Sequence, residues 1–379
     1  MNNNIHVAQV IDSLGEGGAE RLLLTFSEAA KRRGITVTII SLTDDTKPGK
    51  SGFISAQMNL LGVKVITIDS HKLYNPLPLF KLIYIFLRER FDVVQAHLSH
   101  GIILAGMAGW MTRTPVVATL HNPSPRQMGH FQIREAVWAF VLKYMVKRVV
   151  VVGRIIWEAY KSRISTGKMD LVLNAVGGGA SLSRAECRDV RMELTGSENS
   201  KIIFCVGRLI DGKGLYELLS AFSTIYAKYS DLFLVIVGDG DLRERLVLET
   251  ERLHVSDRVK FLGFRNDVRR ILGAGDIYVS ASYSEGMSVA LLEAMASGLP
   301  IIATAVGEAP YLLGENRGIL IPPGSVSAIS NGFTRLLEDP DYMLRMRDSV
   351  REYARIHCSP EIWLDRLTEV YAKAMGNRS

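Results

Sequence analysis

Two cations stand in a short glycine-rich segment that follows an apolar run. Arg208 and Lys213 lie five positions apart, between residues 201–206 (KIIFCV) and 215–222 (LYELLSAF), with Gly207 beside them. A turn of small residues between a strand and a helix exposes N–H groups at the helix N-terminus, where anions bind. A guanidinium and an ammonium group would add charge to hold a diphosphate and to stabilise it as it leaves. The alternative is a basic turn in solvent, and the pattern favours the phosphate site.

Two glutamates eight positions apart accompany a second predicted helix N-terminus that could bind an anion. Glu285 precedes a predicted helix, and we expect Glu293 about two turns into it. The amides of Gly286, Met287 and Ser288 would form another anion-binding helix start. Carboxylates accept hydrogen bonds from vicinal hydroxyls, which suits a sugar and a ribose. The alternative, two surface glutamates on an amphipathic helix, is weak because a charge within LLEAMA would be costly to bury.

The elements that must position these residues alternate between short β-rich runs and helical stretches, which predicts parallel sheets with crossover helices. In the first half the strand candidates are 5–11, 36–41, 63–68, 92–96, 115–119, 148–152 and 170–173. The rhythm restarts at residue 201, so we predict two doubly wound α/β domains. The expected boundaries are 1–176, 177–358 and a C-terminal helix over 359–379 that packs back on the first domain. Ligands of open α/β sheets bind beyond the carboxyl ends of the strands, so we expect the chemistry in a cleft between the domains.

The second half resembles the nucleotide-sugar domain of the GT4-type retaining glycosyltransferases with the GT-B fold. The matching segments are 206–214 (VGRL with KG), 238–246 (GDGDLRERL), 259–264 (VKFLGF), 285–293 (E-x7-E), 296–304 (ASGLPIIAT) and 318–325 (GILIPPGS). Their order and spacing agree over roughly 200–330. The resemblance implies two Rossmann-like domains facing a central cleft, with the donor bound by the second.

The resemblance also implies roles for single residues. Arg208 and Lys213 would bind the donor diphosphate, Glu285 would contact the transferred sugar, and Glu293 the ribose hydroxyls. Three further residues are placed by the resemblance at or near the donor, where a loop contacts the base and a strand ends: Gly238, Phe264 and Arg265.

The first half matches the family more loosely. Gly17 and Gly18, in the segment GEGGAE, resemble the glycine-rich loop that reaches the donor phosphates, although a plain turn is as good a reading. Glu20 stands where a dinucleotide fingerprint requires glycine. His121, in TLHN, resembles the cleft histidine that hydrogen-bonds the donor sugar; the alternative is a loop histidine. His97 ends the run VVQAH and is a candidate for the acceptor side.

Asp239 and Asp241 spell D-x-D, which holds a divalent metal over the diphosphate in other glycosyltransferases. Here the motif lies within GDGDLRERL, and we interpret Asp241 as an N-cap or first-turn residue of the following helix. Because Arg208 and Lys213 already supply positive charge, we expect no essential metal and no cofactor; the nucleotide-sugar is a substrate.

Charge is distributed unevenly along the chain. Residues 1–180 carry 21 Lys and Arg against 12 Asp and Glu, whereas the remainder carries 24 against 27. Residues 77–90 and 126–148 combine apolar, aromatic and basic residues, a pattern that can lie on anionic lipid. The alternative is that these helices cover the sheet. The three cysteines are widely spaced and no apolar run is long enough to span a bilayer. We therefore expect a cytoplasmic protein that can associate with the membrane face.

These observations predict an enzyme, a glycosyltransferase of the hexosyltransferase class (EC 2.4). The donor would be a UDP-sugar first and a GDP-sugar next. The acceptor would be a saccharide, carried on a lipid, in polysaccharide or glycolipid biosynthesis. Two alternatives remain, a nucleotide-sugar epimerase of the same fold and a nucleotide-sugar-binding subunit without activity. Nucleic acid is not expected as a partner, because the basic residues are dispersed and no binding motif is present.

Overall fold

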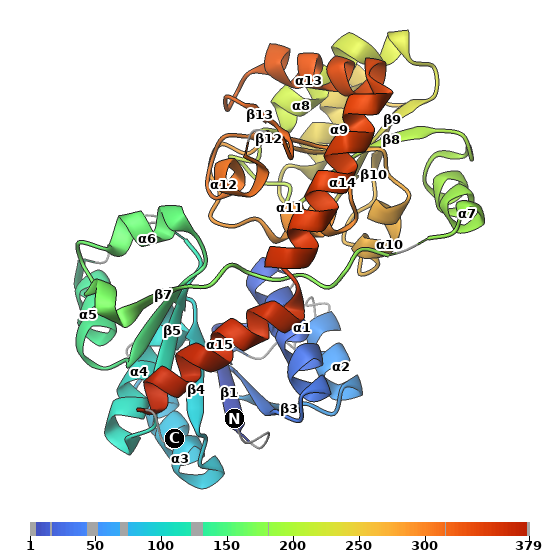
Figure 1. Cartoon of the computed structure of the whole chain (residues 1–379). Helices are drawn as coiled ribbons and strands as arrows, with labels where there is room; N and C mark the ends of the chain where they lie inside the picture. The colour runs from blue at the N-terminus through green and yellow to red at the C-terminus, as the bar shows by residue number, and fades with distance from the viewer. Residues whose placement is uncertain are drawn as a thin grey trace. The chain divides into compact units, whose positions relative to one another are not determined.

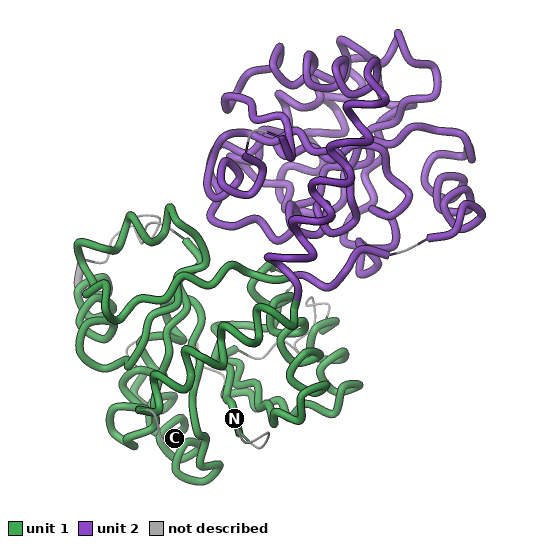
Figure 2. The backbone as a smooth tube through the Cα atoms, in the orientation of Figure 1, with its two compact units in different colours: residues 1–175, 360–379 green, residues 176–359 purple. Residues whose placement is uncertain are grey.

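The structure is a computed structural model of the 379-residue chain. It describes residues 5–15, 17–43, 52–68, 75–122, 132–180, 182–314 and 316–376. The chain divides into two compact units, residues 1–175 with 360–379 and residues 176–359 (Figure 2). Both division points lie one residue from the domain boundaries predicted from the sequence. Each unit is built around a parallel sheet, so the predicted α/β class is confirmed.

The sheet of the first unit has the strand order β3-β2-β1-β4-β5-β6-β7. Its strands are β1 His6–Ile11, β2 Thr36–Ser41, β3 Lys64–Thr67, β4 Val93–His97, β5 Val116–Leu120, β6 Arg148–Val151 and β7 Met169–Leu171. Each strand end lies within two residues of the run expected from the sequence. The central strands β4 and β5 are buried throughout, and their polar side chains are Gln95, His97 and Thr119.

Helices cover both faces of this sheet (Figure 1). They are α1 Gly18–Arg32, α2 Phe53–Leu60, α3 Leu77–Glu89, α4 Ser99–Thr112, α5 Gln132–Tyr144, α6 Arg154–Tyr160 and α15 Pro360–Met375, with the short 3₁₀ helix η2 Thr166–Lys168. Right-handed crossovers place α1 and α2 on one face and α3, α4 and α5 on the other.

The C-terminal helix α15 belongs to the first unit although it follows the second in sequence. It packs against α1 and against β4, β5 and β6. Phe26 of α1 makes edge-to-face contacts with Trp363 and Tyr371 of α15, with ring centroids 6.0 and 6.4 Å apart. Ion pairs at the rim join Arg33 to Asp365 and Lys373 to Asp170. The last helix therefore completes the core of the unit in which the chain begins.

The sheet of the second unit has the strand order β10-β9-β8-β11-β12-β13. Its strands are β8 Lys201–Val206, β9 Leu232–Val237, β10 Val259–Phe261, β11 Ile277–Ser280, β12 Ile301–Thr304 and β13 Ile319–Ile321. Its helices are α7 Arg184–Thr195, α8 Leu215–Ile225, η3 Tyr226–Lys228, α9 Arg243–Arg252, α10 Val268–Gly273, α11 Val289–Ala296, α12 Ala309–Leu313, α13 Val326–Glu338 and α14 Pro340–His357. β8 and β11 are neighbours, and the strand order reverses direction between them.

Two local predictions were wrong. Helix α9 begins at Arg243 with Leu242 at its N-cap, so Asp241 is neither cap nor first-turn residue. The reason is tertiary: the N–H of Leu242 donates to the carbonyl of Leu209, which ties this loop to the loop after β8. Helix α11 begins only at Val289, because the Ser288 hydroxyl caps it, so Glu293 lies little more than one turn into it.

Among the described helices none is both long enough and apolar enough to cross a membrane.

Candidate active site

A pocket opens in the second unit where β8 and β11 end. Its lining includes five of the residues singled out on the sequence: Gly207, Arg208, Lys213, Glu285 and Ser288. The loop between β8 and α8 supplies the first three, and the loop between β11 and α11 the other two. Because β8 and β11 are neighbours in the sheet, segments about 75 positions apart in sequence meet at its carboxyl edge.

Lys213 and Glu285 form the centre of this pocket. The Lys213 ammonium lies 2.5 Å from Oε1 of Glu285, and the Ser282 hydroxyl donates to the same oxygen at 2.8 Å. Both charged side chains remain partly accessible, 24% and 19% exposed. The carboxylate therefore fixes the position of the ammonium group while leaving it within reach of a ligand.

Arg208, unlike Lys213, has no side-chain partner among the described residues. Its side chain is exposed, and it forms no hydrogen bond or ion pair with any described residue. The neighbouring amides are committed elsewhere, because Gly207 N–H donates to Val237 and Leu209 N–H to Asp239, both at 2.9 Å. The positive charge available to an anion at this loop thus comes from the side chains of Arg208 and Lys213 and from the start of α8.

Two glycines allow these loops to approach each other. Gly214, the N-cap of α8, has φ 64°, and a Cβ there would overlap the carbonyl oxygen of Ala281. Gly238 has φ 128°, and a Cβ there would likewise overlap the carbonyl oxygen of Gly207. A side chain at either position would push apart the segments that carry Arg208 and Lys213.

Arg265 is bound within its own unit. Its guanidinium donates to Asp267 at 2.7 Å and to Glu193 at 2.9 Å. The hydrogen bond to Asp267 raises the pKa of Arg265 above its already high usual value, and Arg265 in turn lowers the pKa of Asp267. Phe264 follows Gly263, which forms an isolated bridge with Gly238 at the end of β9. The predicted donor-binding residues of the second unit that do not line the pocket are Gly238, Phe264, Arg265, Gly286, Met287 and Glu293.

Glu293 is nearly fully buried, 5% exposed, on α11. The Ser288 hydroxyl accepts from Leu291 N–H at 3.3 Å and so caps that helix. This cap engages the Leu291 amide, whereas the amides predicted to face a phosphate were those of Gly286, Met287 and Ser288.

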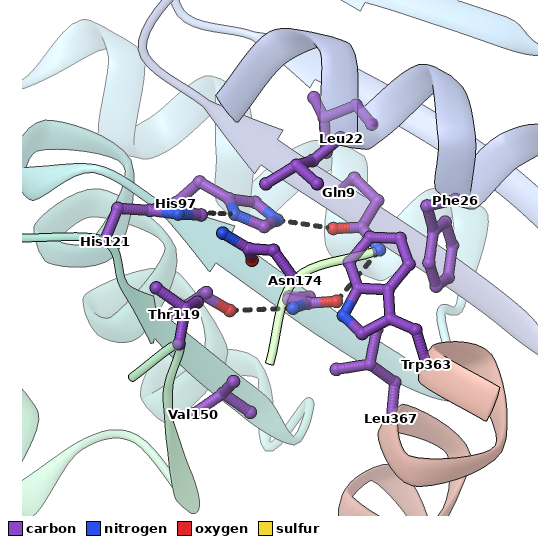
Figure 3. A pocket seen from close by; sticks show the side chains of 13 residues that line it. Gln9, Leu22, Phe26, His97, Thr119, His121, Val150, Asn174, Trp363 and Leu367 are labelled. Carbon is purple, nitrogen blue, oxygen red and sulfur yellow. Dashed lines mark hydrogen bonds between the residues drawn. The ribbon is translucent and has the colours of Figure 1, made fainter. Parts of the chain in front are cut away.

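A second polar cluster lies in the first unit, in a pocket at the carboxyl ends of β4 and β5 (Figure 3). His97, the last residue of β4, is 3% exposed, and His121 follows β5. Their rings stack with centroids 5.3 Å apart, and Nδ1 of His97 lies 3.0 Å from Nε2 of His121. The two histidines singled out on the sequence therefore contact each other directly.

Burial keeps both histidines neutral. It holds the pKa of His97 well below its usual value, with a smaller contribution from His121, and lowers the pKa of His121 to about 4. Neither ring should carry a charge at neutral pH, so neither contributes positive charge to a phosphate site. What the pair offers is directional hydrogen bonding.

The residues behind the histidines were missed on the sequence. Gln9 of β1 and Gln95 of β4 are each 1% exposed, and Tyr371 of α15 is fully buried. A glutamine inside the runs HVAQVI and VVQAH was a visible signal, because an amide is costly to bury without partners. No sequence signal linked Tyr371, which lies 276 positions beyond Gln95.

The carboxylate of Glu20 lies against Gly17 in the glycine-rich loop that precedes α1. Gly17 is the N-cap of α1, and Gly18 begins the helix. The side chain of Glu20, which is buried, fills the space where a Cβ of Gly17 would lie. Neither glycine lines one of the two pockets, and Glu16 lies outside the described residues.

In the part of the chain that the structure describes, no group of three or more His, Cys, Asp or Glu side chains could hold a metal ion.

Comparison with known proteins identifies the class. The model for glycosyl transferases group 1 matches residues 188–357, and the model for Glycosyltransferase Family 4 matches residues 16–176. Together they cover most of both units. The chain is therefore a glycosyltransferase, and it belongs to the GT4-type family with the GT-B fold.

Individual relatives are distant. One component of the human phosphatidylinositol N-acetylglucosaminyltransferase is 28% identical over 85% of this chain, which spans 66% of that protein, just under two thirds of its length. An Escherichia coli UDP-Gal:alpha-D-GlcNAc-diphosphoundecaprenol alpha-1,3-galactosyltransferase is 27% identical over 69% of this chain and 70% of its own. Among solved structures, Anabaena HepE in complex with UDP-glucose superposes with a TM-score of 0.83 at 20% identity, over 97% of this chain and 99% of that one.

Proposed function

We propose that this chain transfers a sugar from a nucleotide-sugar, a UDP-sugar first and a GDP-sugar next, to a saccharide acceptor, with retention of configuration. The observation that carries the proposal is the unpartnered Arg208 guanidinium beside the Lys213–Glu285 pair in one pocket. Such an arrangement suits a leaving group whose negative charge grows during the reaction.

The roles follow from charge and position. Arg208 and Lys213 stabilise the departing diphosphate, and Glu285 accepts hydrogen bonds from the transferred sugar while it holds Lys213. Glu293 is assigned to the ribose and Arg265, with Phe264, to the base. No essential metal is required in this scheme, because the two cations and the start of α8 supply the positive charge.

The choice of donor and acceptor draws on the relatives. The Escherichia coli relative is named for UDP-Gal and a diphosphoundecaprenol-linked acceptor, and the human one for phosphatidylinositol. HepE was solved with UDP-glucose. A lipid-linked saccharide acceptor, in glycolipid or polysaccharide biosynthesis, is the function we propose by analogy.

An exposed apolar surface on the first unit supports membrane association. Its members, which we call the aromatic face, are Phe80, Tyr84 and Leu87 of α3, Trp110 and Met111 of α4, and Phe140 and Tyr144 of α5, all more than half exposed. Helices α3, α4 and α5 pack side by side on one face of the sheet, and each runs antiparallel to the strands. Their C-terminal ends therefore share one edge, together with Arg88, Arg113 and Lys143. Aromatic side chains beside cations fit an anionic lipid surface.

The membrane proposal is tested by pelleting with vesicles of neutral or anionic phospholipid. Wild type should pellet with anionic vesicles, and the double variant Tyr84→Ser with Leu87→Ser, near the C-terminal end of α3, should not. Leu248→Ser, at a residue 62% exposed on α9 of the second unit, is the matched control and should pellet like wild type. Equal pelleting of all three, or none with anionic vesicles, would remove the membrane from the proposal.

The enzymatic proposal is tested by a thermal-shift series with UDP-, GDP- and ADP-sugars. Only the true donor should raise the midpoint, because ligands that bind the folded state alone stabilise it. Donor consumption must then depend on a saccharide acceptor. Consumption without acceptor would favour the epimerase, and binding without consumption the inactive binding protein.

A further inference from the structure

A continuous chain of hydrogen bonds runs from His121 into the sheet of the first unit (Figure 3). His121 Nε2 lies 3.0 Å from His97 Nδ1, and His97 Nε2 lies 2.7 Å from Gln9 Oε1. Gln9 Nε2 donates to Gln95 Oε1 at 3.0 Å, and Gln95 Nε2 donates to Thr119 Oγ1 at 2.7 Å. Every link except His121 is almost completely buried.

The sheet itself aligns these residues. Gln9 of β1 stands opposite Gln95 of β4, and His97 of β4 stands opposite Thr119 of β5. From the other side, the phenol of Tyr371 donates to Gln95 Oε1, which fixes that oxygen as an acceptor. The network is therefore held by three strands and α15, and its members have little freedom to reorient.

The hydrogen bonds have a direction. A neutral imidazole has one N–H donor and one bare nitrogen acceptor. Because the amide oxygen of Gln9 can only accept, the proton of His97 resides on Nε2. His97 Nδ1 is then bare and accepts from the Nε2–H of His121, which leaves His121 with an unprotonated Nδ1.

We propose that His97 is a positioning residue, held by Gln9, that fixes His121 in the tautomer with a bare Nδ1. His121 then recognises a sugar hydroxyl as a hydrogen-bond acceptor, and the selectivity is for a substrate that donates a hydroxyl proton there. The inference rests on the proposed function and on the contact between His121 and the donor sugar that the family resemblance implies. If His121 carried its proton on Nδ1, this N–H would face the proton of the sugar hydroxyl. The lost hydrogen bond would lower the rate about tenfold to hundredfold.

The surroundings favour a neutral pair. Among the described residues no carboxylate and no Lys or Arg shifts the pKa of either ring. The titratable group that faces the cluster from α15 is the Tyr371 phenol, and burial raises its pKa. The direction of this chain of hydrogen bonds from Gln9 through His97 to His121, which we call the relay, is consequently set by Gln9 and not by a charged neighbour.

Gln9→Leu is the sharpest test, because it removes the acceptor and nearly keeps the size. A proton on His97 Nε2 would then be a buried N–H without an acceptor, which is costly. The proton of His97 therefore moves to Nδ1, which donates to His121 Nε2. The proton of His121 must then move to Nδ1, which changes from acceptor to donor.

Gln9→Leu should therefore lose about tenfold or more in kcat relative to wild type. The matched control is Gln95→Leu, which breaks the same Gln9–Gln95 hydrogen bond at an equally buried glutamine that does not touch His97. It should be less stable than wild type but keep the wild-type tautomer of His121. UDP-sugar binding, measured by calorimetry, and the thermal midpoint report whether each variant is folded.

A readout independent of activity separates this inference from the proposed function. The ¹⁵N resonances of the labelled free protein, assigned by comparison with His121→Asn, report which ring nitrogen of His121 carries the proton. Wild type and Gln95→Leu should show a bare Nδ1, and Gln9→Leu a protonated Nδ1. A protonated Nδ1 in wild type, or the same His121 tautomer in wild type and Gln9→Leu, would overturn the inference. An inactive protein with the expected resonances would instead refute the proposed function alone.

Discussion

Removal of the Arg208 guanidinium should separate activity from stability. The side chain is exposed and has no partner among the described residues, so Arg208→Ala should change the free energy of unfolding by less than about 0.5 kcal/mol. A charge-assisted bond to a leaving phosphate contributes about 2–4 kcal/mol in the transition state, which corresponds to a loss of about 30- to 1000-fold in kcat.

The control is Arg245→Ala, at another exposed arginine in the same unit without a described partner. It removes the same charge and should leave both kcat and the thermal midpoint unchanged. Arg208→Lys, which keeps the charge but loses the planar pair of donors, should fall between wild type and Arg208→Ala.

The assay is initial-rate kinetics with saturating acceptor and varied nucleotide-sugar, beside calorimetric unfolding of the same preparations. If Arg208→Ala turned over within about threefold of wild type, the guanidinium would not act on the leaving group and the assignment of the site would fail. A fall in midpoint parallel to the fall in rate would show that Arg208 is structural, against its exposure and lack of partners.

Three further perturbations test the frame around the sites. Gly212→Ala and Gly214→Ala both place a side chain at a positive φ, but only the Cβ at position 214 also overlaps the carbonyl oxygen of Ala281. Chemical denaturation should therefore show a fall in the free energy of unfolding near ~1 kcal/mol for Gly212→Ala and clearly more for Gly214→Ala. Burial raises the pKa of Asp12 to about 6, above an unfolded value near 3.9, so the folded state binds the proton more tightly. The resulting stability is present below about pH 4 and is lost as pH rises to about 6, by roughly 3 kcal/mol, and urea midpoints should show this slope in wild type but not in Asp12→Asn. Asp365→Asn breaks an exposed ion pair with Arg33 and should cost less than about 1 kcal/mol in the same assay.

The strands and the family were readable from the sequence because their causes are local. Apolar runs of four to seven residues between helical segments mark buried parallel strands, and each proved to lie within two residues of its expected ends in the first unit. The segments around Arg208 and Glu285 carried the resemblance to the glycosyltransferases that the comparisons confirmed. The roles assigned to single residues remain predictions.

Helix starts were less readable. Asp241 was expected to cap α9, yet the bond from Leu242 to Leu209 delays the helix by tying two loops together. Capping preference is a weak local effect of about 1 kcal/mol, and a tertiary hydrogen bond of similar strength can override it.

The sequence by itself determined the alternation of a doubly wound α/β protein, and it predicted an anion-binding loop with two cations and a pair of glutamates at the donor site. Only the tertiary structure decided that His97 contacts His121, that Gln9 and Gln95 stand behind them, and that Tyr371 closes the network from the far end of the chain. Local patterns depend on neighbours in the chain, whereas this network depends on strand order and register, which bring β1, β4, β5 and α15 together across hundreds of residues.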